Sequence, residues 1–154
     1  MDNIRIIIGN SCKDLGESIS LKLDSSPINC TLDKFSNGEI RVEIKESIRQ
    51  KDIYIVQTGY SNLNSNYNVN DYLVETLIII DACKRSMANS VNVIMPYYPY
   101  SRQDKKDEAR SAISAKLFAN LLTSSGINRL ITMDLHSSQI QGFVNVPVDN
   151  IYSI

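Results

Sequence analysis

The chain has 154 residues, enough for one folded domain with a single core, and its formal net charge is −1. This charge gives no electrostatic drive toward nucleic acid or an anionic membrane, and no apolar segment approaches the length of a membrane span, so we expect neither as a partner. The three cysteines are widely spaced and include no Cys-x-x-Cys pair, which argues against a disulfide framework and favours a cytoplasmic location.

The chain begins with a predicted strand followed by a predicted helix. Residues 4–8 are an apolar run that ends at Gly9, as expected of a short buried strand. Ser11 and Asp14 have the Ser-x-x-Asp spacing of a helix N-terminal cap, and apolar residues follow at helical intervals. We expect this helix to end before the Ser-Ser-Pro segment at 25–27.

A β-hairpin is predicted next. Segments 29–35 and 40–45 are strand-like, and the Asn-Gly pair at 37–38 is a strong turn signal between them. The turn carries Phe35, Asn37 and Glu39. An aromatic ring beside an amide and a carboxylate suits recognition of a purine, although an ordinary hairpin turn fits the same spacing.

The rest of the chain alternates between strands and helices. Residues 52–57 predict a strand and residues 58–68 a polar surface loop. The apolar run at 77–80 fits a strand or a helix, and we favour a helix capped at Asn70-Asp71 because the run continues into residues 81–85. The later predicted elements are a strand, a helix and two strands: 91–95, 112–125, 128–133 and 146–150.

This alternation predicts an α/β fold, with a mostly parallel sheet, helices on both faces and an attached β-hairpin. We expect residues 1–154 to form a single domain without internal repeats. The carboxyl ends of parallel strands meet at one edge of a sheet, where ligands of α/β proteins bind. The polar segments after 91–95 and 128–133 should therefore converge there.

Residues 102–107, Arg-Gln-Asp-Lys-Lys-Asp, carry five charges in six positions. Arg102 can form a bidentate contact with phosphate, and Gln103 can contact a base or sugar. Asp104 and Asp107 can hold Mg²⁺ through water. A solvated loop is the alternative, but two prolines and three tyrosines at 96–100 favour a binding site, because a solvated loop needs neither.

His136, the only histidine, lies just after the predicted strand 128–133, and Asp134 stands two residues before it. It can ligate a metal or bind a phosphate oxygen, and a single structural hydrogen bond is the alternative. One histidine without matching ligands argues against a structural zinc site. No Walker or Gly-x-Gly-x-x-Gly motif occurs, so nucleotide binding requires another device.

Together these residues resemble the ribose-phosphate pyrophosphokinases over essentially the whole chain. The most specific motifs are Arg-Gln-Asp-Lys-Lys-Asp at 102–107 and Asp-Leu-His-x-x-Gln-Ile-Gln-Gly-Phe at 134–143. The similar segments are 34–39, 52–57, 99–107, 113–116, 132–143 and 147–152.

The resemblance implies a phosphoribosyltransferase-like, Rossmann-like fold and a Mg²⁺-dependent transfer of diphosphate from ATP to ribose 5-phosphate. The products are phosphoribosyl pyrophosphate and AMP, for nucleotide biosynthesis. It also implies a homo-oligomer in which an adenine-contacting loop reaches the neighbouring subunit's site. The implied roles are adenine contact for Phe35, Asn37 and Glu39, ATP contact for Arg102, Gln103 and Asp107, and catalysis and Mg²⁺ ligation for His136.

Three departures from the family pattern qualify this expectation. The chain resembles only the first of two family domains and lacks the glycine-rich ribose-5-phosphate loop of the second. The connection 59–69 is several residues longer than usual, and Ala112 replaces a proline, which makes its loop less rigid. We expect the N-terminal, ATP-binding half of such an enzyme; the alternative is a non-catalytic regulatory or associated subunit that oligomerises with a longer homologue.

Overall fold

Short runs of isoleucine and valine form a parallel sheet in the computed structural model, which describes residues 3–61 and 65–153. Within those residues the sheet has five strands in the order β1-β4-β5-β6-β7, and every neighbouring pair is parallel. Its strands are β1 (Ile4–Ile8), β4 (Asp52–Val56), β5 (Ser90–Met95), β6 (Arg129–Met133) and β7 (Val148–Ile151). Parallel sheets are covered on both faces, so their strands need apolar side chains on both sides.

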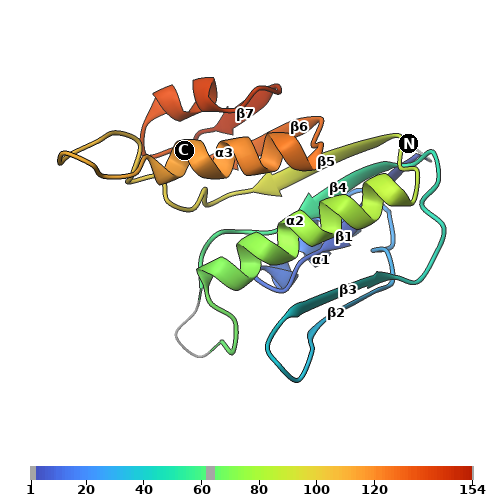
Figure 1. Ribbon diagram of the computed structural model, residues 1–154. Coiled ribbons are helices and arrows are strands. Elements are labelled where there is room, and N and C mark those ends of the chain that lie inside the picture. Colours follow the sequence, from blue (N-terminus) through green and yellow to red (C-terminus); the bar gives the residue numbers. More distant parts are fainter. Residues whose placement is uncertain (1–2, 62–64, 154) are drawn as a thin grey trace.

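Helices cover both faces of this sheet, which confirms the expected α/β architecture. Helix α1 (Lys13–Lys22) lies on one face, and α2 (Val69–Arg85) and α3 (Ser114–Ser125) lie together on the other (Figure 1). Residues such as Ile55, Ile79 and Val93 are completely buried between the layers. Each isoleucine so buried contributes about 2 kcal/mol of hydrophobic stabilisation.

The predicted β-hairpin is present as a separate two-stranded antiparallel sheet of β2 (Cys30–Lys34) and β3 (Ile40–Ile44). Its apolar face packs against α2, so the helix lies between the hairpin and the parallel sheet (Figure 1). Gly38 has a φ of 92°, a conformation that glycine adopts without steric cost. The glycine of the Asn-Gly pair therefore closes the turn.

The helix starts differ from the sequence predictions. The N-cap of α1 is Cys12, with no side-chain capping bond, so the predicted Ser11–Asp14 cap is wrong. The Ser11 hydroxyl instead donates to Gln57 Oε1 at 2.6 Å. Helix α2 is capped two residues earlier than the predicted Asn70, by Asn68 in a reciprocal capping box with Asp71. In both cases the sequence pattern predicted the helix correctly, but it did not predict which residue each polar side chain binds.

The C-terminal region differs in two further details. A 3₁₀ helix, η1 (Ser138–Phe143), follows β6 where no helix was predicted. Strand β7 begins at Val148, two residues later than the predicted start at 146. Lys116 of α3 donates to the Phe143 carbonyl oxygen at 2.7 Å, which fixes the end of η1 against α3.

Candidate functional site

Two polar loops leave the carboxyl edge of the sheet side by side. Strands β5 and β6 are paired in parallel, with Ile94 opposite Ile131 and Met95 opposite Thr132. The Met133 backbone nitrogen donates to the Pro96 carbonyl oxygen at 3.1 Å, so the strands stay joined to their last residues. The loops after β5 and β6 therefore begin next to each other, as predicted.

A pocket of about 160 Å³ lies between these loops. It is lined by Tyr97, Tyr98, Ser101, Arg102, Met133, Asp134, Leu135 and His136. Arg102 and His136, which lie 34 positions apart in the sequence, thus share one cavity. Both side chains are exposed, so they are open to a ligand at this edge.

Buried aromatic packing supports the floor of this pocket. The Tyr98 hydroxyl donates to the Ala115 carbonyl oxygen at 2.9 Å, and its ring packs on Phe118 with 5.3 Å between centroids. Burial raises the pKa of the Tyr98 hydroxyl, which keeps it a neutral hydrogen-bond donor. Tyr98 is therefore a fixed part of the scaffold that leads into the Arg102 loop.

Two residues of this edge have unusual backbone conformations. Tyr100 has a φ of 57° and Asp134 a φ of 45°, in the left-handed region that few non-glycine residues occupy. The Asp134 carboxylate accepts hydrogen bonds from the Ser153 backbone nitrogen and hydroxyl. Such conformations persist where surrounding contacts enforce them, and they cluster at functional sites. The sequence carries no local signal for them.

Gln103 and Asp107 lie farther along the same loop, beside a second cavity of about 370 Å³. That cavity is lined by Gln103, Lys105, Asp107, Glu108, Ser111 and Ala112. The Gln103 carbonyl oxygen accepts from the Ala115 backbone nitrogen at 3.2 Å, at the start of α3. The predicted ATP contacts are thus divided between two cavities, with Arg102 at the first and Gln103 and Asp107 at the second.

Phe35, Asn37 and Glu39 are not near the Arg102 loop within one chain. They occupy the hairpin turn, which Figure 1 shows well separated from the loop that follows β5. The turn is held by its own bonds: Phe35 N donates to the Glu39 carbonyl oxygen at 2.8 Å, and Glu39 N to Asn37 Oδ1 at 3.2 Å. Phe35 remains 52% exposed, with the Arg41 guanidinium 5.9 Å from its ring centroid. An apolar ring is thus presented to an external partner.

A buried polar network, which sequence analysis missed, lies beneath this edge. The Glu75 carboxylate accepts from Gln57 Nε2 at 2.7 Å and from the backbone and side-chain nitrogens of Asn10. Gln57 in turn accepts from Ser11. A Cβ on Gly9 would lie 2.2 Å from Gln57 Oε1, so a larger residue there would displace the Gln57 amide from this network. The signal in the sequence that could have identified this network was the placement of Gln57 and Glu75 directly after apolar residues.

The edge pocket has few potential metal ligands of its own. Among the described residues, no group of three or more His, Cys, Asp or Glu side chains is placed to hold a metal. Asp134 and His136 are the two such side chains in the pocket. Because Mg²⁺ keeps several waters and binds substrate phosphates, one or two protein ligands are compatible with a Mg²⁺ that enters with a triphosphate.

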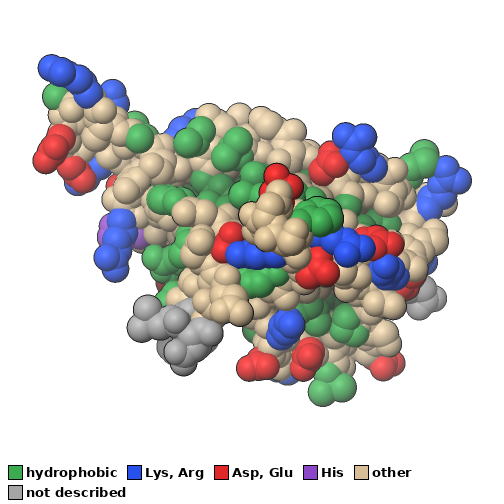
Figure 2. Space-filling model, turned by 60° about the horizontal axis from the view of Figure 1, so that its bottom comes forward, with side chains coloured by type: hydrophobic (Ala, Val, Ile, Leu, Met, Phe, Trp, Pro, Cys, Tyr) green, Lys and Arg blue, Asp and Glu red, His purple; other side chains and the backbone are tan. Residues whose placement is uncertain are grey.

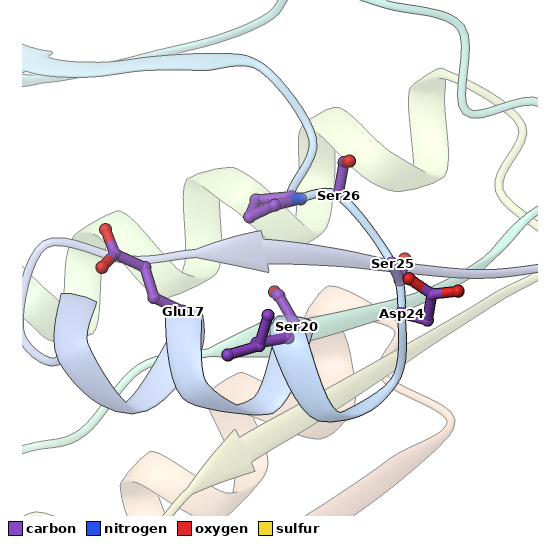
Figure 3. Close-up of a pocket in the computed structure, with 7 residues that line it drawn as sticks. Glu17, Ser20, Asp24, Ser25 and Ser26 are labelled. Carbon is purple, nitrogen blue, oxygen red and sulfur yellow. The ribbon is translucent and has the colours of Figure 1, made fainter.

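A further cavity of about 310 Å³ lies beside the end of α1 (Figure 3). Glu17 and Asp24 stand at its two ends and point away from each other. No set of polar groups converges there. Figure 2 shows positive and negative side chains interspersed on one face of the molecule, without a segregated basic surface.

An α/β domain with a polar crevice at the carboxyl edge of its parallel sheet belongs to the class that binds ligands at that edge. The family model for the N-terminal domain of ribose phosphate pyrophosphokinase matches residues 4–126. The chain therefore belongs to the ribose phosphate pyrophosphokinase family and corresponds to its N-terminal domain.

Individual relatives agree with this assignment. Ribose-phosphate pyrophosphokinase 4 of Saccharomyces cerevisiae is 47% identical over 153 residues, and ribose-phosphate pyrophosphokinase A of Dictyostelium discoideum is 49% identical over 152 residues. Each match covers 99% of this chain and 46% of the relative. The phosphoribosylpyrophosphate synthetase of Mycobacterium smegmatis has a TM-score of 0.90 at 39% identity, over 97% of this chain and 48% of that one.

The chain thus spans about half the length of the curated relatives it matches. In the part of the chain that the structure describes, no helix is both long and apolar enough to cross a membrane.

Proposed function

We propose that this chain is the ATP-binding half of a ribose-phosphate pyrophosphokinase. The observation that carries the proposal is the shared pocket of Arg102 and His136 at the carboxyl edge, in a chain of this family. Phosphoryl-type transfer depends on positioning and charge neutralisation more than on covalent chemistry by the protein. A guanidinium and an imidazole in one open cavity supply that kind of site.

In the proposed reaction, the 1-hydroxyl oxygen of ribose 5-phosphate bonds to the β-phosphorus of ATP. The bond from that phosphorus to the oxygen of the α-phosphate breaks, AMP leaves with this oxygen, and the hydroxyl proton passes to solvent. Arg102 holds phosphate oxygens through charge-assisted hydrogen bonds. Gln103 and Asp107, farther along the loop, contact the same nucleotide. The product, phosphoribosyl pyrophosphate, serves nucleotide biosynthesis.

Mg²⁺ is the proposed cofactor, and when bound it neutralises negative charge on the triphosphate. His136 is the proposed catalytic residue and metal contact, with the Asp134 carboxylate beside it in the pocket. The small number of protein ligands supports a metal that is held largely by ATP and water.

We also propose that the chain acts as a homo-oligomer. The turn of Phe35, Asn37 and Glu39 lies apart from the chain's own Arg102 loop, and the Phe35 ring is exposed. Both features favour contact between this turn and adenine in a neighbouring subunit's site. Residues 1–154 form one domain in this proposal, a second domain supplies the ribose 5-phosphate site, and three free cysteines support a cytoplasmic location.

The test is AMP release from ATP, Mg²⁺ and ribose 5-phosphate, with and without the second half of a longer relative. Activity that requires the second half supports the proposal. ATP binding without activity in either mixture favours the associated-subunit alternative. Failure to bind ATP would overturn the nucleotide site itself.

A further inference from the structure

Lys34, the last residue of β2, is held on three sides. Its ammonium donates to Asp71 Oδ2 at 2.8 Å and to the Asn66 carbonyl oxygen at 3.2 Å. It also lies 4.4 Å from the centroid of the Tyr67 ring, a cation–π distance. The side chains of Lys34 and Asp71 are 25% and 19% exposed, so this ion pair is screened less than an ordinary surface pair.

The long connection between β4 and α2 supplies two of these three contacts. Its residue Tyr67 stacks on Tyr72 at 5.7 Å and 8° between ring planes, and Tyr72 is only 3% exposed. The Ser61 hydroxyl donates to the Tyr67 carbonyl oxygen at 2.7 Å. Tyr67 is therefore anchored to the core through Tyr72, and Lys34 is anchored through Tyr67.

The first turn of α2 contacts both loops of the proposed nucleotide site. Asp71 binds Lys34, which directly precedes Phe35 in the hairpin turn. Asn70 accepts a hydrogen bond from the Tyr100 hydroxyl, two residues before Arg102. Hydrogen bonds from Lys34 and from the Asn68 backbone outweigh partial burial and lower the pKa of Asp71. The carboxylate is thus charged throughout the neutral range.

We propose that Lys34 is a positioning residue: clamped by Asp71 and Tyr67, it holds the turn of Phe35, Asn37 and Glu39 in the orientation that a nucleotide requires. This inference rests on the proposed function for its purpose, but the clamp itself is independent of any ligand. The longer connection 59–69 then has a role, because it supplies the Tyr67 ring and the Asn66 carbonyl that complete the clamp.

The chain has no tryptophan, so Phe35→Trp places a single fluorescent reporter in the turn. In this background Lys34→Met should increase acrylamide quenching of the tryptophan and lower its anisotropy, and Lys34→Arg should restore both. Lys45→Met is the matched control, because Lys45 is on the same hairpin and pairs with Glu43 at 2.6 Å, away from the turn. Unchanged quenching in the Lys34→Met protein would overturn the proposal.

Nucleotide affinity separates this inference from the proposed function. With Phe35 present and the chain assembled into an oligomer, Lys34→Met should weaken ATP binding about three- to tenfold, the change expected from loss of a partly screened ion pair. In the Phe35→Ala background the same change should have no effect; an equal loss there would show that Lys34 does not act through the turn. If the parent chain binds no ATP, the proposed function fails, and the quenching comparison still decides whether Lys34 holds the turn.

Discussion

The side-chain amide nitrogen of Gln57 donates to the carboxylate of Glu75 at 2.7 Å, and both side chains are completely buried. Asn10 supplies two further donors to the same carboxylate. A buried carboxylate is tolerated when hydrogen bonds replace its hydration. This pair joins the loop after β1, the end of β4 and the middle of α2 beneath the candidate site.

Glu75→Ala should therefore destabilise the fold, because it leaves three buried or half-buried donors without an acceptor. We expect a loss of about 2–4 kcal/mol in the free energy of unfolding, measured by urea denaturation. Glu17→Ala, on the exposed side of α1, is the control and should change the free energy of unfolding by less than about 0.5 kcal/mol. An equal, small effect of both variants would show that the network is not structural.

Arg102→Ala should weaken ATP binding about ten- to a hundredfold, because charge-assisted contacts to phosphate are lost. Isothermal titration calorimetry measures this directly. Arg85→Ala removes another exposed arginine, from the far end of α2, and should leave the affinity unchanged. ATP affinity that does not respond to Arg102→Ala would count against this pocket.

His136→Ala should lower the affinity for Mg²⁺–ATP while the melting temperature stays close to that of the parent. The side chain is exposed, so its removal should alter stability by less than about 0.5 kcal/mol. The measurement is the effect of His136→Ala on ATP affinity with and without Mg²⁺. The two effects should differ if His136 lies near the metal. A large fall in melting temperature would instead support a structural hydrogen bond.

Phe35→Ala should reduce nucleotide binding only where the chain is assembled into an oligomer. The ring is exposed and lies apart from the chain's own Arg102 loop. Sedimentation at the concentration used for binding identifies the assembled form, and Tyr60→Ala serves as an exposed aromatic control. The same loss of affinity in a proven monomer would exclude the contact between subunits.

The stability of the sheet should depend on pH through Asp52. Its carboxylate accepts hydrogen bonds from Ser90 Oγ and Asn89 Nδ2, both at 2.7 Å, and these bonds lower its pKa. A pKa lowered by folding adds stability above the unfolded-state value, and this stability is lost as the pH falls through the folded-state value.

Asp52→Asn should therefore lower the free energy of unfolding at pH 7, by at most about 1 kcal/mol because the group is well solvated. The difference from the parent should shrink below about pH 4, where aspartate begins to be protonated. Asp24→Asn is the control, since its φ of 50° suits asparagine equally well. A difference that stays constant with pH would contradict the assigned charge effect.

The α/β class, the hairpin and the helical state of residues 77–80 were predicted from local pattern and are confirmed. Periodicity and turn signals are properties of neighbouring residues, and they survive in the fold because each element buries its own apolar face. The meeting of Arg102 with His136 followed from one further rule, that parallel strands end at the same edge.

Only the tertiary structure decided what each polar side chain contacts. The Ser11 hydroxyl had the spacing of a helix cap but binds Gln57, which is 46 residues away, and Glu75 meets Asn10 across 65 residues. The clamp on Lys34 likewise joins a strand end, a long connection and a helix start. Such partners are set by how distant elements pack together, and a short window of the sequence carries no information about that packing.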